Sequence, residues 1–107
     1  MGLDCYFILP KTRSAAVTPL YSVPYELGAY QEMPRVYHFR GRCYFDLDVP
    51  VGFELFESHL PNRLVTRAAR RMQRIIAAED APPPMLLALA SMFGFFGHHG
   101  YDLTSSW

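Results

Sequence analysis

The sequence is poor in lysine and cysteine, and it has no net charge. Lys11 is the only lysine, against nine arginines. The two cysteines, Cys5 and Cys43, are too few for a disulfide framework, so we expect free thiols in a reducing compartment. Basic and acidic side chains are equal in number. The molecule as a whole therefore has no electrostatic bias toward nucleic acid.

Several functional motifs are also missing. The sequence contains no glycine-rich phosphate loop, no Cys-x-x-Cys pair and no Gly-x-Ser-x-Gly elbow. Its main apolar stretch, residues 85–96, has twelve residues, whereas a membrane-spanning helix needs about 20. The N-terminus lacks the pattern of a secretion signal, because Asp4 interrupts its apolar run and Pro10 ends it. We therefore expect a cytoplasmic protein with no cofactor and no membrane contact.

The residues that are present predict one α+β domain over residues 1–107. Half of them are hydrophobic, which argues against disorder, and the length suits a single domain. Aromatic and β-branched residues predict strands near 3–9, 35–40 and 43–49. Helical patterns follow near 62–79 and 84–97. Because the strands come first, we expect a small antiparallel sheet covered by two C-terminal helices.

Turn residues refine this prediction in the first half of the chain. Gly41 and Arg42 suit a two-residue type II′ turn that would join the strands at 35–40 and 43–49 into a hairpin. Residues 53–57 fit either a further strand or the start of a helix, and both alternatives stay open.

The helix expected at 84–97 has apolar residues on all sides, which predicts that it is buried. Pro84 is tolerated in a first turn, and Gly97 or Gly100 is suited to ending the helix. Ala90 and Gly94, four residues apart, would allow another backbone to approach closely. The helix is expected either to form the centre of the core or to form a homodimer interface through residues 85–96.

The chain opens Met-Gly-Leu-Asp-Cys-Tyr. This start resembles that of small, mostly uncharacterised bacterial and phage proteins that begin Met-Gly-Leu-Asp-x-Tyr. The resemblance covers six residues of the 107, and the later aromatic motifs of those proteins are not recognisable here. It implies a bacterial or phage origin and no particular activity.

Residues 62–79 have the clearest helical pattern, with Asn62 as the expected N-cap and Ser58 as an alternative. One face of this helix is apolar and includes Leu64, Val65, Ala68, Met72, Ile75 and Ile76. The opposite face, within about 100° of arc, holds five arginines: Arg63, Arg67, Arg70, Arg71 and Arg74. No acidic residue four positions away relieves their repulsion. This pattern predicts either an acidic partner or a solvated face neutralised within the chain by Asp46, Asp48, Glu54 and Glu57.

Residues 10–34 include four prolines and are expected to form a long connection. Tyr21, Tyr25 and Tyr30 recur along it. Tyrosine gives a large contact area at a low cost in entropy, so these side chains suit a recognition surface. The alternative is that they pin the connection to the core.

Two further groups have residue types that can support chemistry. His98, His99 and Asp102 are possible metal-ligand types, but their spacing fits no specific pattern, and histidines at a helix C-terminus are explained by the helix dipole. Cys43 with His38 resembles a thiol and its base, but no third group orients them. We expect no metal site and no catalytic residue.

These observations favour recognition over catalysis. The expected function is that of a small bacterial or phage interaction protein, of inhibitor or adaptor type. It would bind a protein with an acidic surface through the arginines and the loop tyrosines. Binding of DNA or RNA by the same basic helix is the alternative, and an enzyme of unknown class is third.

Overall fold

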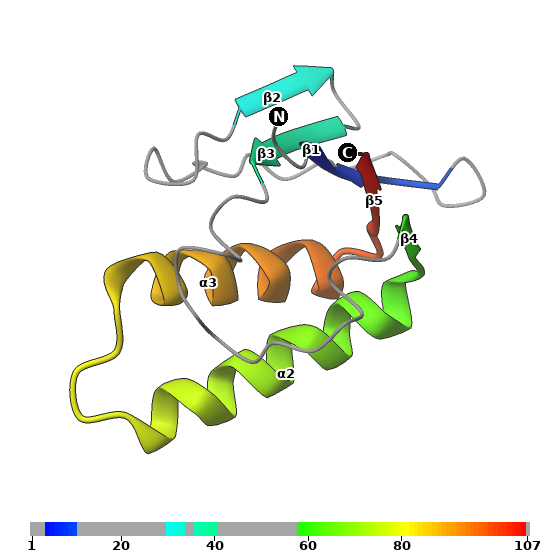
Figure 1. Ribbon diagram of the computed structural model, residues 1–107. Coiled ribbons are helices and arrows are strands. Elements are labelled where there is room, and N and C mark those ends of the chain that lie inside the picture. The colour runs from blue at the N-terminus through cyan, green and yellow to red at the C-terminus, as the bar shows by residue number, and fades with distance from the viewer. Residues whose placement is uncertain (1–3, 11–29, 34–35, 41–57, 107) are drawn as a thin grey trace.

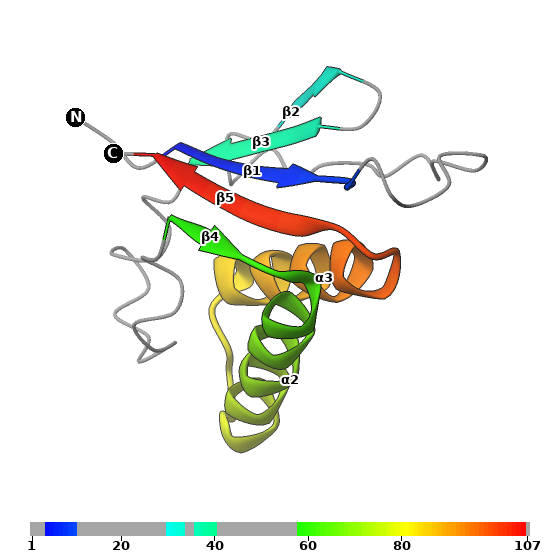
Figure 2. The same ribbon diagram turned by 90° about the vertical axis from the view of Figure 1, so that its right-hand side faces the viewer.

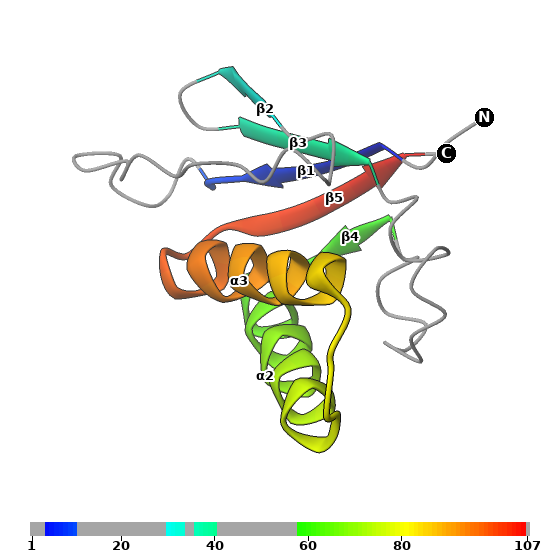
Figure 3. The same cartoon turned by 90° about the vertical axis from the view of Figure 1, so that its left-hand side faces the viewer.

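The computed structural model describes residues 4–10, 30–33, 36–40 and 58–106 (Figure 1). Its strands form one five-stranded antiparallel sheet in the order β2-β3-β1-β5-β4. They are β1 (Asp4–Ile8), β2 (Tyr30–Met33), β3 (Val36–Arg40), β4 (His59–Leu60) and β5 (Asp102–Ser106). Helices α2 (Asn62–Ala78) and α3 (Pro84–His98) lie on one side of the sheet (Figures 2 and 3). The predicted fold class is confirmed.

The alternation of buried and partly exposed residues along β1 shows which face of the sheet packs against the helices. Cys5 and Phe7 are fully buried, whereas Asp4, Tyr6 and Ile8, which alternate with them, are partly exposed. Phe7 lies opposite Tyr37 of β3 on one side and Leu103 of β5 on the other. Because residues opposite each other point to the same face, these pairs give the sheet one apolar face.

Helix α3 packs against that apolar face, as its composition predicted. The ring of Phe7 lies 5.1 Å from Phe93 and 4.6 Å from Phe96, and Phe96 also lies 4.6 Å from Tyr37. Seven residues of the helix are buried: Leu86, Leu89, Ala90, Met92, Phe93, Phe96 and Gly97. A narrow outward strip is exposed and consists of Leu87, Ser91, Gly94 and His98. The homodimer through residues 85–96 stays a prediction.

Helix α2 packs on α3 and leads away from the sheet toward its C-terminal end (Figures 2 and 3). The two helices are in close contact at Gly97, where an added Cβ would lie 3.1 Å from the Oγ1 atom of Thr66. Gly94, where we predicted a close approach, instead has open space beside it. The close approach therefore lies about one turn further along α3, because the helices diverge toward their connected ends.

The start of α2 corrects the prediction that Asn62 is an N-cap. Pro61 holds the capping position, and Asn62 is the first helical residue. The N–H of Asn62 donates to the Oδ1 atom of Asp102 at 2.9 Å, so a carboxylate from β5 satisfies a free N–H of the helix. The Asn62 amide donates to the carbonyls of Gly97 and Tyr101, at 2.8 and 3.0 Å. These bonds join the start of α2 to the end of α3.

Three strands were not predicted. Residues 102–106 form β5, which follows the two helices and lies between β1 and β4. Residues 30–33, assigned to the long connection, form β2, and residues 59–60 form β4. The predicted strand at 43–49, its turn at Gly41 and Arg42, and residues 53–57 all lie outside the described residues.

Candidate binding surface on helices α2 and α3

The five arginines of α2 share the face that points away from the core. Arg63, Arg67, Arg70 and Arg74 are exposed, and Arg71 is half-buried. Val65, Ala68 and Met72 are buried on the opposite side. The predicted division of this helix into a basic and an apolar face is confirmed. We call the set Arg63, Arg67, Arg70, Arg71 and Arg74 the arginine face.

Most of this positive charge is not neutralised by the carboxylates that the structure describes. The ion pairs among the described residues join Asp4 to His38 and Arg40, and Asp102 to His59. None of them involves the four exposed members of the arginine face. The acidic residues that we considered as neutralising partners, Asp46, Asp48, Glu54 and Glu57, lie outside the described residues. Like charges on one helix repel, so this surface favours an anionic partner.

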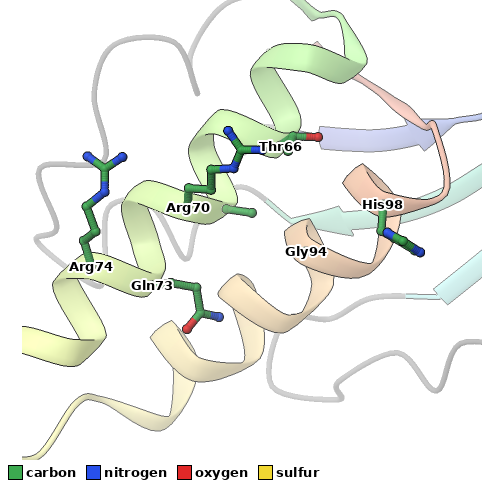
Figure 4. A pocket seen from close by; sticks show the side chains of 7 residues that line it. Thr66, Arg70, Gln73, Arg74, Gly94 and His98 are labelled. Carbon is green, nitrogen blue, oxygen red and sulfur yellow. The ribbon is translucent and has the colours of Figure 1, made fainter.

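A groove of about 480 Å³ lies between α2 and α3 and borders the arginine face. Helix α2 lines it with Thr66, Ala69, Arg70, Gln73 and Arg74, and α3 lines it with Gly94 and His98. In Figure 4, Gln73 extends toward α3, Arg70 extends along α2 toward Thr66, and Arg74 points outward. Arg67 and Arg71 lie away from this groove, beside Leu64 and Ala68.

The two glycines of α3 set the shape of the groove. Gly97 allows the backbone of Thr66 to come within 3.3 Å of where a Cβ would be, and this contact closes one end. At Gly94 an added Cβ would meet no atom within 4 Å. The groove therefore opens where α3 presents no side chain, and two of the residues that line its α2 side are arginines.

The groove was not predicted from the sequence. Arg70 and Arg74 were identified as candidates, but Thr66, Gln73, Gly94 and His98 were not connected with them. The one available signal was a glycine in the middle of a segment of strong helix-forming residues. Glycine lowers the stability of a helix, so its presence there indicates a packing or functional role.

The residues of the metal hypothesis have other contacts. His98 and His99 lie with their rings 5.0 Å apart, and His99 also lies 4.6 Å from Phe95. Asp102 caps α2, with its Oδ2 atom 3.9 Å from the Nε2 atom of His59. Within the described ranges, no three histidine, cysteine, aspartate or glutamate side chains are grouped so that they would hold a metal ion.

A polar cluster of Asp4, His38 and Arg40 joins β1 and β3 on the sheet face away from the helices. The Oδ1 atom of Asp4 lies 2.9 Å from His38 Nε2 and 3.0 Å from Arg40 Nη1. The hydrogen bond with His38 lowers the pKa of Asp4 from its ordinary value of 3.8, desolvation opposes this, and the charge of Arg40 supports it. Cys43, the predicted partner of His38, lies outside the described residues.

The predicted loop tyrosines are only partly placed. Tyr21 and Tyr25 lie outside the described residues. Tyr30, assigned to the loop, begins β2, and its backbone lies opposite His38 in β3. The structure therefore leaves their part in binding as a prediction.

Comparisons with known proteins give no further assignment. Searches against protein-family models, curated proteins and solved structures found no match. Among the described helices, none is long and apolar enough to cross a membrane.

Proposed function

We propose that this chain is a small interaction protein, of inhibitor or adaptor type, that binds an acidic protein through its arginine face. The observation that carries the proposal is the exposure of Arg63, Arg67, Arg70 and Arg74 on one face, without an ion pair to any described carboxylate. The helix that holds them leads away from the sheet, so a partner has access to them (Figure 2).

Arginine suits this role better than lysine. Its planar guanidinium can donate two parallel hydrogen bonds to one carboxylate, and it is more weakly hydrated than an ammonium group. A row of such groups binds a matching row of carboxylates favourably and repels a basic protein, which gives selectivity among partners. The five arginines are also held on a regular helix, which fixes their spacing before the partner arrives.

Two features favour a protein over DNA or RNA. The chain has no net charge, so a long phosphate backbone gains little from it beyond α2. Glu79 and Asp80 follow the helix directly and are exposed, so they would repel phosphates at the end of the arginine face. A protein can place its carboxylates against the arginines alone.

The proposal also includes the loop tyrosines, the source of the chain and its location in the cell. Tyr21, Tyr25 and Tyr30 would add an uncharged contact area to the same recognition function. A bacterial or phage source and a cytoplasmic location fit the opening residues and the thiol content of the chain. These parts rest on the sequence.

The test is affinity purification from a bacterial lysate, with and without nuclease treatment. We expect a specific partner to be retained after nuclease treatment and to be lost when Arg67, Arg70 and Arg74 are all changed to Glu. The matched control changes the same three residues to Lys, which keeps the charge and should keep part of the binding. Far-UV circular dichroism verifies that each variant is folded.

Two results would overturn the proposal. Retention of the partner by the triple Glu variant would show that the arginine face is only a solvated surface. Loss of all bound material on nuclease treatment, with tight binding to generic DNA and a steep salt dependence, would assign the face to nucleic acid.

A further inference from the structure

The groove beside the arginine face has an apolar floor as well as a cationic wall. Ala69 is only 7% exposed, and Gly94 presents no side chain. Leu87 does not line the groove itself, but it lies seven residues before Gly94 and so belongs to the same strip of α3, about two turns away. It is 44% exposed and is the one large hydrophobic side chain that is exposed in the described part of the chain. The strip and the wall together form an amphipathic surface.

We propose that this groove binds an acidic amphipathic helix of the protein partner. The apolar side of that helix packs on Leu87, Ala69 and Gly94, and its carboxylates pair with Arg70 and Arg74. This inference rests on the proposed function and adds the chemistry and the shape of the segment that is recognised.

The shape of the groove favours a helix over a small ligand. Its lining side chains are largely exposed, so a small molecule would keep most of its surface in water, whereas small-molecule sites bury most of their ligand. Two neighbouring helices offer a third helix a contact on both sides. The missing side chain at Gly94 leaves room for the close approach that helix packing requires, with axes about 8–10 Å apart.

The distribution of charge favours carboxylates over a phosphate backbone. Arg70 and Arg74 line one side of the groove only, and the α3 side is lined by Gly94 and His98. An amphipathic helix matches this asymmetry, because its anchors recur at i, i+3 or i+4, and i+7 on one face and its charges lie beside them. The amide of Gln73, which extends toward α3, adds a neutral hydrogen-bonding group in the groove (Figure 4).

The probe is a synthetic helical peptide of about 18 residues, or five turns, built from Glu, Leu and Ala with leucines along one face. A second peptide has Gln in place of every Glu. Each is added to the ¹⁵N-labelled 107-residue chain, and NMR follows the Gly94 amide and the side-chain amide of Gln73. We expect the acidic peptide to shift both signals. The Gln peptide should bind more weakly by a factor of about ten or more.

Three variants locate the contact. Gly94→Leu fills the groove, and since an added Cβ there meets nothing within 4 Å, the fold is expected to tolerate it. We expect it to weaken peptide binding about tenfold or more, as should Arg70→Glu with Arg74→Glu. Arg40→Glu is the charge-matched control, because Arg40 is exposed at the end of β3 and belongs neither to the arginine face nor to the groove. It should change the affinity for the peptide only slightly.

Failure of this inference differs from failure of the proposed function. If Gly94→Leu binds the acidic peptide and the natural partner as tightly as the unchanged protein does, the groove is not the binding site of the helix, although the arginine face still binds the partner. Shifts at Gly94 that grow with protein concentration alone would assign the groove to a second copy of the chain. Tighter binding of a DNA duplex than of the peptide, with the same signals shifted, would assign it to nucleic acid. Each of these results overturns the inference.

Discussion

Gly94 and Gly97 lie three residues apart in α3, and changing each to alanine should affect stability in opposite directions. Both positions are helical, so both gain the helix propensity of alanine over glycine, about 1 kcal/mol. At Gly94 the new methyl group enters open space. Gly94→Ala should therefore raise the free energy of unfolding by about 1 kcal/mol.

At Gly97 the same methyl group meets helix α2. It would lie 3.1 Å from Thr66 Oγ1, 3.3 Å from its Cα and 3.4 Å from its backbone nitrogen. Overpacking of this kind costs about 1–3 kcal/mol, and two of the three atoms are backbone atoms that move only with the helix. After the gain in propensity, Gly97→Ala should lower the free energy of unfolding by up to about 2 kcal/mol.

Urea unfolding followed by circular dichroism measures both variants, and melting provides a second reading at about 4 °C per kcal/mol for a chain of this size. Thr66→Ala combined with Gly97→Ala removes the hydroxyl but leaves the backbone atoms, so it should restore only part of the loss. Stabilisation by Gly97→Ala equal to that by Gly94→Ala would refute the reasoning. It would mean that α2 and α3 do not touch at Thr66.

Three further perturbations test other parts of the structure. Leu89→Asp places a carboxylate at a fully buried site and should cost roughly 4 kcal/mol or more in urea unfolding, whereas Leu87→Asp, at an exposed site, should cost little. Asp102→Ala removes the acceptor for Asn62 N–H and should cost about 1 kcal/mol, with Asp102→Asn intermediate; equal stability of all three forms would exclude the cap. Asp4 has a lowered pKa, so its contribution to stability is complete above its ordinary value of 3.8 and is lost as pH falls through the lower folded pKa. The stability difference between the unchanged protein and Asp4→Asn should therefore be present at pH 7 and vanish in acid, and a difference that persists in strong acid would contradict the assignment.

The elements predicted correctly are those whose signal is local. Aromatic and β-branched residues identified β1 and β3, and helical patterns identified α2 and α3, each within one position at either end. These are properties of a few successive residues. The arginine face followed from the same helical pattern. No knowledge of the partner elements was needed.

The elements that were missed depend on pairing across the chain. Strand β5 has the sequence Asp-Leu-Thr-Ser-Ser, in which Leu103 is the only apolar residue. It forms a strand because β1 and β4 bind it on both sides, where Ser105 lies opposite the buried Cys5. The cap on α2 is similar, since its acceptor, Asp102, is 40 residues away in sequence. Local rules identify Asn62 there because they consider only neighbouring residues.

The position of the groove depends both on local helical spacing, which places the arginines, and on contacts between distant residues, which hold α2 against α3. Asn62 ties the start of α2 to the carbonyls of Gly97 and Tyr101, and Asp102 holds the first N–H of the same helix. These bonds fix the two helices at the end next to the sheet, while residues 79–83 connect their other ends. The separation at Gly94 is therefore set by contacts that lie within the described core, and Arg70 and Arg74 lie on the part of α2 beyond them. A partner that binds there meets charges on a helix whose position is determined by the fold, so binding needs no rearrangement of the sheet or of its packing against α3.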